Sequence, residues 1–205
     1  MGQKIIQLAE KHRILISRVL VTFIIALCII SRHSWEEDSY IILFFEALGL
    51  ILIGVCTLGR LWTSMYISGY KTHNLIQEGP YSVVRNPLYF FSFLGATGLG
   101  FSSENILVLG LIVSLFAIYY PFVILAEEQG MVKIHGEEYI KYMERVPRFI
   151  PKLSLFKEPE LYIVKAKKYR KTFFDAMWFI WFYMLLQIVE RFQEMGLLPV
   201  IFRVP

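Results

Sequence analysis

The most unusual chemical feature of this sequence is a pair of adjacent glutamates, Glu127 and Glu128, which directly follows 21 uncharged residues at positions 106–126. Two carboxylates at the boundary of a long apolar stretch repel each other, and they need a partner if they are buried. A cationic ligand, or the hydroxyls of a bound ribose, would supply that partner. The alternative is a solvated acidic pair that ends a membrane span.

A second polar cluster, residues 79–89, combines a Gly-Pro turn with the start of another apolar stretch. Pro87 suits the first position of a helix, and Asn86 would then be the N-cap of that helix. The unpaired N–H groups of a helix start bind carboxylates and other acceptors, so this segment could hold a ligand. The alternative is a capped helix that enters a bilayer, with Tyr81 and Tyr89 as interfacial aromatic residues.

Two further clusters carry side chains suited to binding. Tyr139 and Tyr142 are three positions apart, so they share one face of a helix, and Arg148 lies in the proline-bounded segment that follows. Arg60 comes at the end of an apolar stretch, where its guanidinium could bind a carboxylate or phosphate in a bidentate manner. The alternative for the tyrosine segment is an interfacial amphipathic helix. The alternative for Arg60 is a side chain that extends toward lipid headgroups.

Apolar helices must position these clusters. The chain has 205 residues, of which 56% are hydrophobic and 19% charged, with a mean hydropathy of +0.53, and this composition excludes a disordered chain and two independent soluble domains. Five stretches are apolar enough to be membrane spans, at residues 14–30, 41–58, 87–103, 106–126 and 173–189. We therefore expect an all-α polytopic membrane protein of about five transmembrane helices, with the third and fourth joined as a tight hairpin.

Lysine and arginine are distributed unequally among the connections between these stretches. Seventeen of them fall in residues 1–13, 59–86 and 127–172, and only three fall in the connections on the opposite side. The positive-inside rule then predicts a cytosolic N-terminus, an external C-terminus and a ligand pocket at the cytosolic face. No sorting signal is evident, which favours a prokaryotic inner membrane.

Several classes of partner follow from the remaining charges. The net charge of +4 is too small to argue for nucleic acid, and the basic run at residues 165–171 predicts contact with anionic lipid headgroups. Cys28 and Cys56 lie in apolar stretches, which excludes a disulfide framework. His135 has no partner at metal-ligand spacing, so no metal site is expected.

Taken in order, these motifs resemble the isoprenylcysteine carboxyl methyltransferase family and the wider group of membrane methyltransferases that includes phospholipid N-methyltransferases. The resemblance rests on Arg60, Gly79-Pro80-Tyr81, Arg85-Asn86-Pro87-Leu88-Tyr89, Glu127-Glu128, Gly136-Glu137-Glu138-Tyr139 with Tyr142, and residues 146–151. It implies a methyltransferase core at residues 50–152. Residues 1–49 would hold an amphipathic segment, the first span and the start of the second, and residues 153–205 a basic interfacial segment and the fifth span.

The resemblance also implies S-adenosyl-L-methionine as cofactor and a lipidic methyl acceptor that enters from the bilayer. The implied cofactor-binding residues are Gly79, Tyr81, Arg85, Asn86, Pro87, Tyr89, Glu127, Glu128, Tyr139 and Tyr142. Arg60 is similar to the arginine that faces the acceptor carboxylate. Arg148 falls in the segment that closes the site, and the resemblance gives both arginines a catalytic role.

Two departures from the carboxyl methyltransferases concern the acceptor. Eukaryotic members have histidine at the position of Asn86, whereas phospholipid N-methyltransferases have Asn-Pro there, and Val123 stands where an arginine is expected four residues before the acidic pair. Arg60 favours a carboxylate acceptor and Asn86 an amine, and the sequence leaves both open. A non-enzymatic membrane scaffold or transporter subunit is the alternative from another class.

Overall fold

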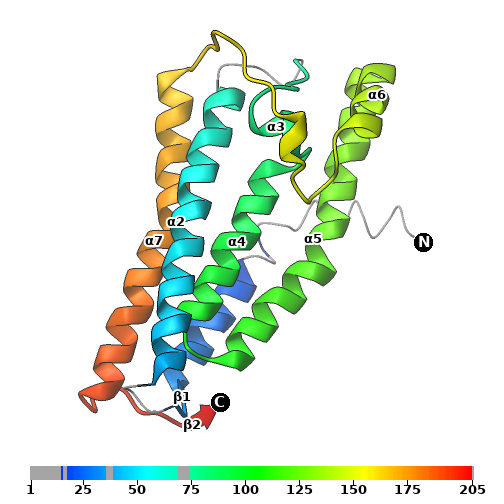
Figure 1. Ribbon diagram of the computed structural model, residues 1–205. Helices are drawn as coiled ribbons and strands as arrows, with labels where there is room; N and C mark the ends of the chain where they lie inside the picture. The colour runs from blue at the N-terminus through cyan, green and yellow to red at the C-terminus, as the bar shows by residue number, and fades with distance from the viewer. Residues whose placement is uncertain (1–14, 16–17, 36–38, 69–73, 205) are drawn as a thin grey trace.

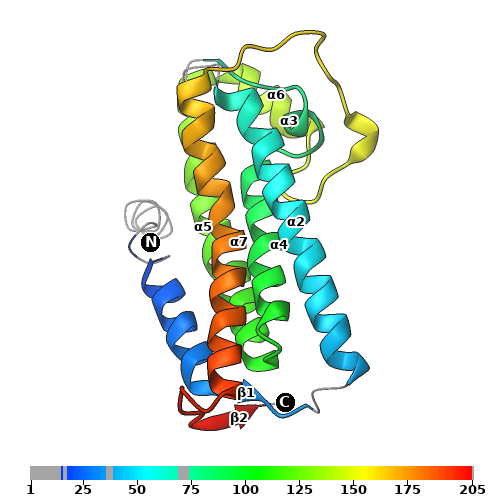
Figure 2. The ribbon, with the colours of Figure 1, turned by 90° about the vertical axis from the view of Figure 1, so that its left-hand side faces the viewer.

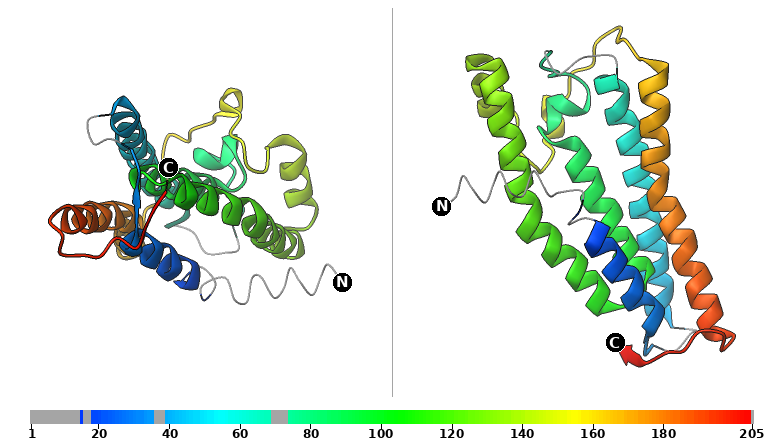
Figure 3. Two further views of the ribbon diagram at one scale, coloured as in Figure 1. Left: turned by 90° about the horizontal axis from the view of Figure 1, so that it is seen from below. Right: turned by 180° about the vertical axis from the view of Figure 1, so that it is seen from behind.

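A computed structural model of the chain describes residues 15, 18–35, 39–68 and 74–204, so most of the expected N-terminal amphipathic segment lies outside the described residues. Four long helices form the body of the molecule (Figure 1): α2 (Tyr40–Ser68), α4 (Pro87–Ser102), α5 (Ile106–His135) and α7 (Ala166–Glu194). A shorter apolar helix, Arg18–Ile30, packs beside them (Figure 3). The structure is mostly helical, as the sequence predicts.

Three of these helices are long and apolar enough to cross a membrane, namely α2, α5 and α7, with 29, 30 and 29 residues. At 1.5 Å per residue each extends over roughly 45 Å, which exceeds the ~30 Å of a hydrocarbon core. Large apolar side chains such as Leu43, Ile118 and Trp181 are exposed along them, as expected for surfaces that face lipid. Because α4 has only 16 residues and Arg18–Ile30 is also short, the count of five spans stays a prediction.

The small elements gather at the two ends of the bundle (Figure 2). One end carries α3 (Pro80–Val83), α6 (Glu137–Arg145) and the 3-10 helix η1 (Leu153–Leu155). The other end carries two short parallel strands that the sequence analysis did not predict, β1 (Ser31–His33) and β2 (Phe202–Val204). We call these the α3–α6 end and the β1–β2 end.

The predicted hairpin between α4 and α5 is confirmed, with residues 103–105 as its link. The side chain of Asn105 starts α5 by accepting hydrogen bonds from the backbone N–H groups of Leu107, at 3.0 Å, and Val108, at 3.2 Å. From this link α5 diverges from α4 toward the α3–α6 end (Figures 1 and 3). At the α3–α6 end, the start of α4 is therefore separated from the C-terminal part of α5.

Helices α2 and α4 pack closely because small residues face each other between them. A Cβ added to Gly98 would stand 2.9 Å from the backbone oxygen of Gly49, so a side chain at position 98 would push the helices apart. This close contact also brings Arg60 of α2 to Ser92 of α4, where Nη1 of the arginine donates a hydrogen bond to the serine hydroxyl.

Candidate functional site

A polar cavity of about 370 Å³ lies at the α3–α6 end, where α5 diverges from α4. Its lining includes nine of the ten predicted cofactor-binding residues: Tyr81, Arg85, Asn86, Pro87, Tyr89, Glu127, Glu128, Tyr139 and Tyr142. These residues come from the segment that leads into α4, from α5 and from α6. The structure thus brings together motifs that are up to 61 residues apart in the chain.

Backbone hydrogen bonds hold the segment after α6 against the segment before α4. The N–H of Arg85 donates to the oxygen of Pro147, and the N–H of Lys152 donates to the oxygen of Val83, both at 2.9 Å. The proline-bounded segment is therefore docked along the entry to α4, which fixes the wall of the cavity.

Gly79 is the tenth predicted residue, and it does not line the cavity. It precedes α3 with a φ of 58°, a conformation that favours glycine, and a Cβ here would collide with the ring of Tyr66. Its N–H donates to the oxygen of Lys157 at 2.7 Å. In this structure Gly79 shapes the turn before α3 and does not face the cavity.

The two adjacent glutamates lie inside α5, because this helix continues nine residues beyond the predicted end of the span at 126. Neighbouring residues on a helix point about 100° apart, so the two carboxylates have different partners. Oε1 of Glu127 accepts a hydrogen bond of 2.7 Å from the hydroxyl of Tyr89, and this contact links α5 to the first turn of α4.

Glu128 is buried and held by three side chains. Its Oε1 lies 3.1 Å from Nε of Arg85 and from Nδ2 of Asn86, and its Oε2 lies 2.9 Å from Nε of Arg148. The Arg85 side chain is 8% exposed, whereas the Arg148 side chain is 49% exposed. The Glu128 carboxylate thus joins α5 to the start of α4 and to the segment after α6.

Two sequence predictions change with this arrangement. Asn86 precedes α4 at the N-cap position, and α4 begins at Pro87 as predicted, but the Asn86 side chain makes no cap bond. Its Nδ2 instead donates to Glu128 and, at 3.0 Å, to the backbone oxygen of Arg148. Arg148 lies outside the cavity lining, and its guanidinium neutralises Glu128.

The two tyrosines of α6 form a buried wall of the cavity. The ring centroids of Tyr139 and Tyr142 are 5.7 Å apart, and the Tyr142 hydroxyl donates to the backbone oxygen of Tyr81 at 2.7 Å. Burial, with the nearby Glu128 charge, raises the pKa of Tyr139 to about 12. Both tyrosines share one face of α6, as the spacing predicts, and the Tyr139 hydroxyl stays protonated at neutral pH.

Arg60 lies deeper in the bundle than the sequence predicts. The apolar stretch ends at 58, but α2 continues to Ser68, so Arg60 is eight residues, or roughly 12 Å, from the end of its helix. Its guanidinium carbon stands 5.6 Å from the ring centroid of Phe179 of α7, within range of a cation–π interaction. Nε of Arg60 is buried without a hydrogen-bond partner, and the guanidinium forms no ion pair with any carboxylate of the residues described.

A second cavity, of about 310 Å³, surrounds this guanidinium. Apart from Arg60 and Ser92, its lining is almost wholly apolar: Leu20, Val21, Ile24, Ile25, Cys28, Ala96, Leu99, Val108, Ile112, Leu115, Phe116, Tyr120, Trp178, Phe179, Phe182 and Leu186. Tyr89 of the polar cavity contacts Tyr120 of the apolar cavity, with ring centroids 5.7 Å apart. The two cavities are therefore neighbours, separated by this pair of rings.

Helix α7 contributes side chains that the sequence analysis did not assign to a site. Lys168 lines the polar cavity, and Trp178 and Phe179 line the apolar one. Lys168 belongs to the basic run expected at lipid headgroups, and nothing in its spacing separates it from its neighbours in that run. Only the packing of α7 against α2 and α4 reveals these contributions.

One protein-family model matches the central part of the chain. The phospholipid methyltransferase family matches residues 41–138, which include Arg60, the segment 79–89 and both glutamates. Tyr139, Tyr142 and Arg148 lie beyond the matched residues. No solved structure matches the chain.

Two curated relatives match over nearly the whole chain. The nickel-cobalt-cadmium resistance protein NccN of Alcaligenes xylosoxydans xylosoxydans is 34% identical over 195 residues, which is 95% of this chain and 91% of the relative. The cobalt-zinc-cadmium resistance protein CzcN of Cupriavidus metallidurans is 32% identical over 188 residues, with coverage of 92% and 86%. With the apolar helices and the family match, these findings show that the chain is a membrane protein of the phospholipid methyltransferase family.

Proposed function

We propose that this protein is an integral membrane methyltransferase that uses S-adenosyl-L-methionine and acts on a lipidic acceptor. The observation that carries this proposal is the pair of adjoining cavities, one polar with carboxylates and tyrosines, the other apolar with a single guanidinium. A water-soluble donor and a lipidic acceptor need two such compartments in contact. A non-enzymatic scaffold would need neither of these two cavities.

The residues of the polar cavity suit this cofactor, which supplies a methyl group on a positively charged sulfur. Carboxylates and aromatic faces attract such a cation, and Glu127, Tyr89 and Tyr139 provide both. The ammonium of Lys168 suits the cofactor's own carboxylate. A volume of about 370 Å³ is within the range of small-molecule sites.

Methyl transfer from a sulfonium needs little acid–base help, so the protein contributes mainly by alignment. The Tyr89–Glu127 hydrogen bond fixes the wall between the two cavities. Arg60 is bonded to Ser92, which is three residues, or roughly 4.5 Å along α4, from Tyr89. An acceptor anchored by Arg60 would therefore have its reacting group next to the polar cavity.

An anionic acceptor fits the electrostatics of Arg60. A half-buried cation in an apolar cavity without a carboxylate partner is costly, and an anionic ligand would relieve that cost. A carboxylate acceptor is already ionised at neutral pH, with an ordinary α-carboxyl pKa of roughly 3.5, so it needs an anchor but no base. We therefore favour O-methylation of a lipid-linked carboxylate, as in the isoprenylcysteine carboxyl methyltransferases.

The family match supports a second candidate, N-methylation of a phospholipid amine. Arg60 would then bind the phosphate of the lipid. An amine must lose a proton before it attacks, and Glu127 is the carboxylate at the cavity wall that could accept this proton. The Asn86-Pro87 pair, which is shared with phospholipid N-methyltransferases, favours this candidate.

The orientation is part of the proposal. Arg85 and the basic residues of segment 127–172 belong to the α3–α6 end, so we propose that this end, with its cofactor cavity, faces the cytosol of a prokaryotic cell. With five spans, which are part of the same proposal, the N-terminus would be cytosolic and the C-terminus external. The basic first turns of α7 would contact anionic headgroups.

The names of the two relatives suggest a physiological setting. Those proteins are described by resistance to nickel, cobalt, zinc or cadmium. We propose that methylation of a membrane component by this chain supports growth under excess divalent metal. A strain that lacks the gene should grow worse in graded metal concentrations, and an inactive Glu127→Gln variant should fail to restore growth.

The decisive experiment is transfer of a labelled methyl group from S-adenosyl-L-methionine into host membranes, followed by identification of the labelled lipid. A base-labile methyl ester would support the carboxylate acceptor, and a methylated amine the phospholipid. Glu137→Gln is a matched control, because Glu137 is 80% exposed on α6 and pairs with Lys141 away from the cavity. Label transfer that is equal in the wild type, Glu127→Gln and an empty membrane would overturn the proposal.

A further inference from the structure

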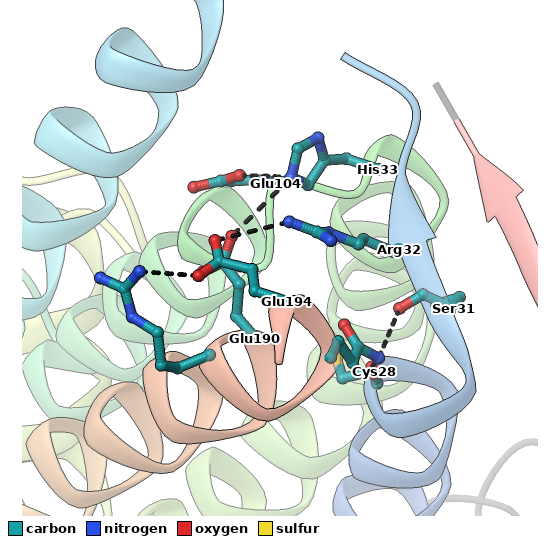
Figure 4. A network of polar contacts seen from close by, with 9 residues as sticks. Cys28, Ser31, Arg32, His33, Glu104, Glu190 and Glu194 are labelled. Carbon is teal, nitrogen blue, oxygen red and sulfur yellow. Dashed lines mark hydrogen bonds and ion pairs between the residues drawn. The ribbon is translucent and has the colours of Figure 1, made fainter. Parts of the chain in front are cut away.

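Three potential metal ligands meet at the β1–β2 end, opposite the polar cavity (Figure 4). His33 comes from β1, Glu104 from the link between α4 and α5, and Glu190 from α7. Nε2 of His33 lies 3.1 Å from Oε2 of Glu104 and 3.7 Å from Oε1 of Glu190. All three ligand atoms lie within 4.8 Å of one another, although the residues are 71 and 86 positions apart in the chain.

These separations fit one small cation. Zinc binds imidazole nitrogen at 2.0–2.1 Å and carboxylate oxygen at 2.0–2.2 Å, so neighbouring ligand atoms of a tetrahedral site are roughly 3.4 Å apart. The two measured distances from His33 bracket that value. A histidine nitrogen with two carboxylate oxygens is also a ligand set that divalent transition metals accept.

The Glu104 carboxylate has no donor of its own. This residue is 2% exposed, yet neither of its oxygens accepts a hydrogen bond from the described part of the chain, so its contact with His33 lacks hydrogen-bond geometry. Buried carboxylates are normally paired with hydrogen-bond donors or coordinate a metal. A small cavity of about 30 Å³ has room for an ion or water, and its lining includes His33, Glu190 and also Arg32, although Glu104 itself is not among the lining residues.

The surrounding charge also favours a cation. Glu190 and Glu46 both lie close enough to Glu104 to add negative charge around it. Arg32 is nearby, but it pairs with Glu194 at 3.4 Å. Carboxylates are thus crowded at this end of the bundle.

The scaffold around the three residues is well ordered by hydrogen bonds. Asn105, next to Glu104, donates from Nδ2 to the Ser31 hydroxyl at 3.0 Å. Gln193, one turn after Glu190, donates from Nε2 to the backbone oxygens of Cys28 and Ile29, at 3.1 and 2.9 Å. These bonds tie both the α4–α5 link and α7 to the segment that leads into β1, which helps to preorganise the three residues.

We propose that His33, Glu104 and Glu190 bind one divalent transition-metal ion, such as Zn²⁺ or Co²⁺, with water as a fourth ligand. The ion would join β1, the α4–α5 link and α7. It lies at the opposite end from the cofactor cavity, so this proposal does not depend on the methyltransferase proposal. The sequence analysis assigned no metal site, because it looked for partners only at local spacing.

The test uses the full-length protein, purified in detergent without a polyhistidine tag and freed of metal with a chelator. Equilibrium dialysis against Zn²⁺ with elemental analysis should give one ion per chain. Glu104→Gln and Glu190→Gln should each weaken binding by ~10-fold or more, since ligand loss should exceed the effect of removing a supporting residue. Co²⁺ should give visible absorption bands in the wild type that are lost in His33→Ala.

Two control variants identify adventitious binding. Glu194→Gln removes a neighbouring carboxylate that pairs with Arg32 and Arg191, and His135→Ala removes a histidine at the other end of α5. Both should keep the wild-type Zn²⁺ affinity, and all variants should keep the wild-type helical content by circular dichroism. No saturable site in the wild type would overturn the proposal. So would equal Zn²⁺ affinity in the wild type, Glu104→Gln and Glu190→Gln.

Discussion

The hydroxyl of Tyr89 lies 2.7 Å from Oε1 of Glu127, and this single hydrogen bond spans the gap between two diverging helices at the cavity wall. It also orients a carboxylate toward the space where we propose that a cationic cofactor binds. The other glutamate of the pair, Glu128, is directed to two arginines instead. We therefore expect Glu127 to act in cofactor binding and Glu128 to act in stability, and mutation of each residue can separate these roles.

Glu127→Gln should abolish most cofactor binding while the fold stays intact, because the amide keeps the size of the side chain but removes its charge. In wild-type protein, S-adenosylhomocysteine at 100 times its Kd should stabilise the fold by about 2.7 kcal/mol. We expect little or no thermal shift for Glu127→Gln under the same conditions. Glu137→Gln should show the same thermal shift as the wild type. A wild-type thermal shift in Glu127→Gln would show that Glu127 does not take part in cofactor binding.

Glu128→Gln should destabilise the protein rather than affect the cofactor alone. Breaking one side of a buried ion pair typically costs 3–5 kcal/mol, and we expect the lower part of this range because the amide can still accept hydrogen bonds and Arg148 is half exposed. Hydrogen exchange should speed up in residues 146–152, which Arg148 and the backbone bonds hold against α4. An unchanged melting temperature with normal exchange would show that the Glu128–arginine contacts contribute nothing to stability.

The sequence identified much of this site because its signals are local. The Glu127-Glu128 pair is adjacent, Tyr139 and Tyr142 share a helix face by spacing alone, and Pro87 marks the start of a helix. The shared face needs only the periodicity of a helix and the helix start only the conformational preference of proline, whereas the cofactor-binding role of these residues came from the family resemblance. The hairpin of α4 and α5 follows in the same way from a link of three residues.

The parts that the sequence could not supply depend on tertiary contact. The end of the apolar stretch at 58 predicts that Arg60 lies at a helix end, but α2 continues through Gly59 to Ser68. The arginines that neutralise Glu128 lie 43 residues before it and 20 after it, and local pattern does not choose between them and other basic residues. The meeting of His33 with Glu104 depends on how two strands and three helix ends pack.

Arg60→Ala should weaken use of the lipidic acceptor and leave cofactor affinity nearly unchanged. The guanidinium lines the apolar cavity and is absent from the lining of the polar one. We expect kcat/KM for the acceptor to fall by roughly 10-fold to 100-fold, since a charge-assisted contact in a dry site contributes about 1.5–3 kcal/mol. Arg60→Lys should restore part of this loss, because a lysine keeps the charge but not the bidentate geometry.

The same variants distinguish anchoring from a purely structural role. A structural arginine would lower the melting temperature and cofactor affinity together, and neither would depend on the acceptor. Equal loss of cofactor and acceptor affinity in Arg60→Ala would place the guanidinium in the cofactor shell and contradict the assignment.

Ala96→Phe should block the acceptor by filling the apolar cavity. Ala96 lines this cavity together with Ile112 and Leu186, and an added aromatic ring would occupy much of its 310 Å³. Because the polar cavity is untouched, S-adenosylhomocysteine should still produce the wild-type thermal shift while methyl transfer to membranes falls at least ~10-fold. Ala47→Phe is a suitable control, since Ala47 is exposed on the outer surface of α2. Wild-type transfer by Ala96→Phe would mean that the acceptor reaches the methyl donor by a route other than this cavity.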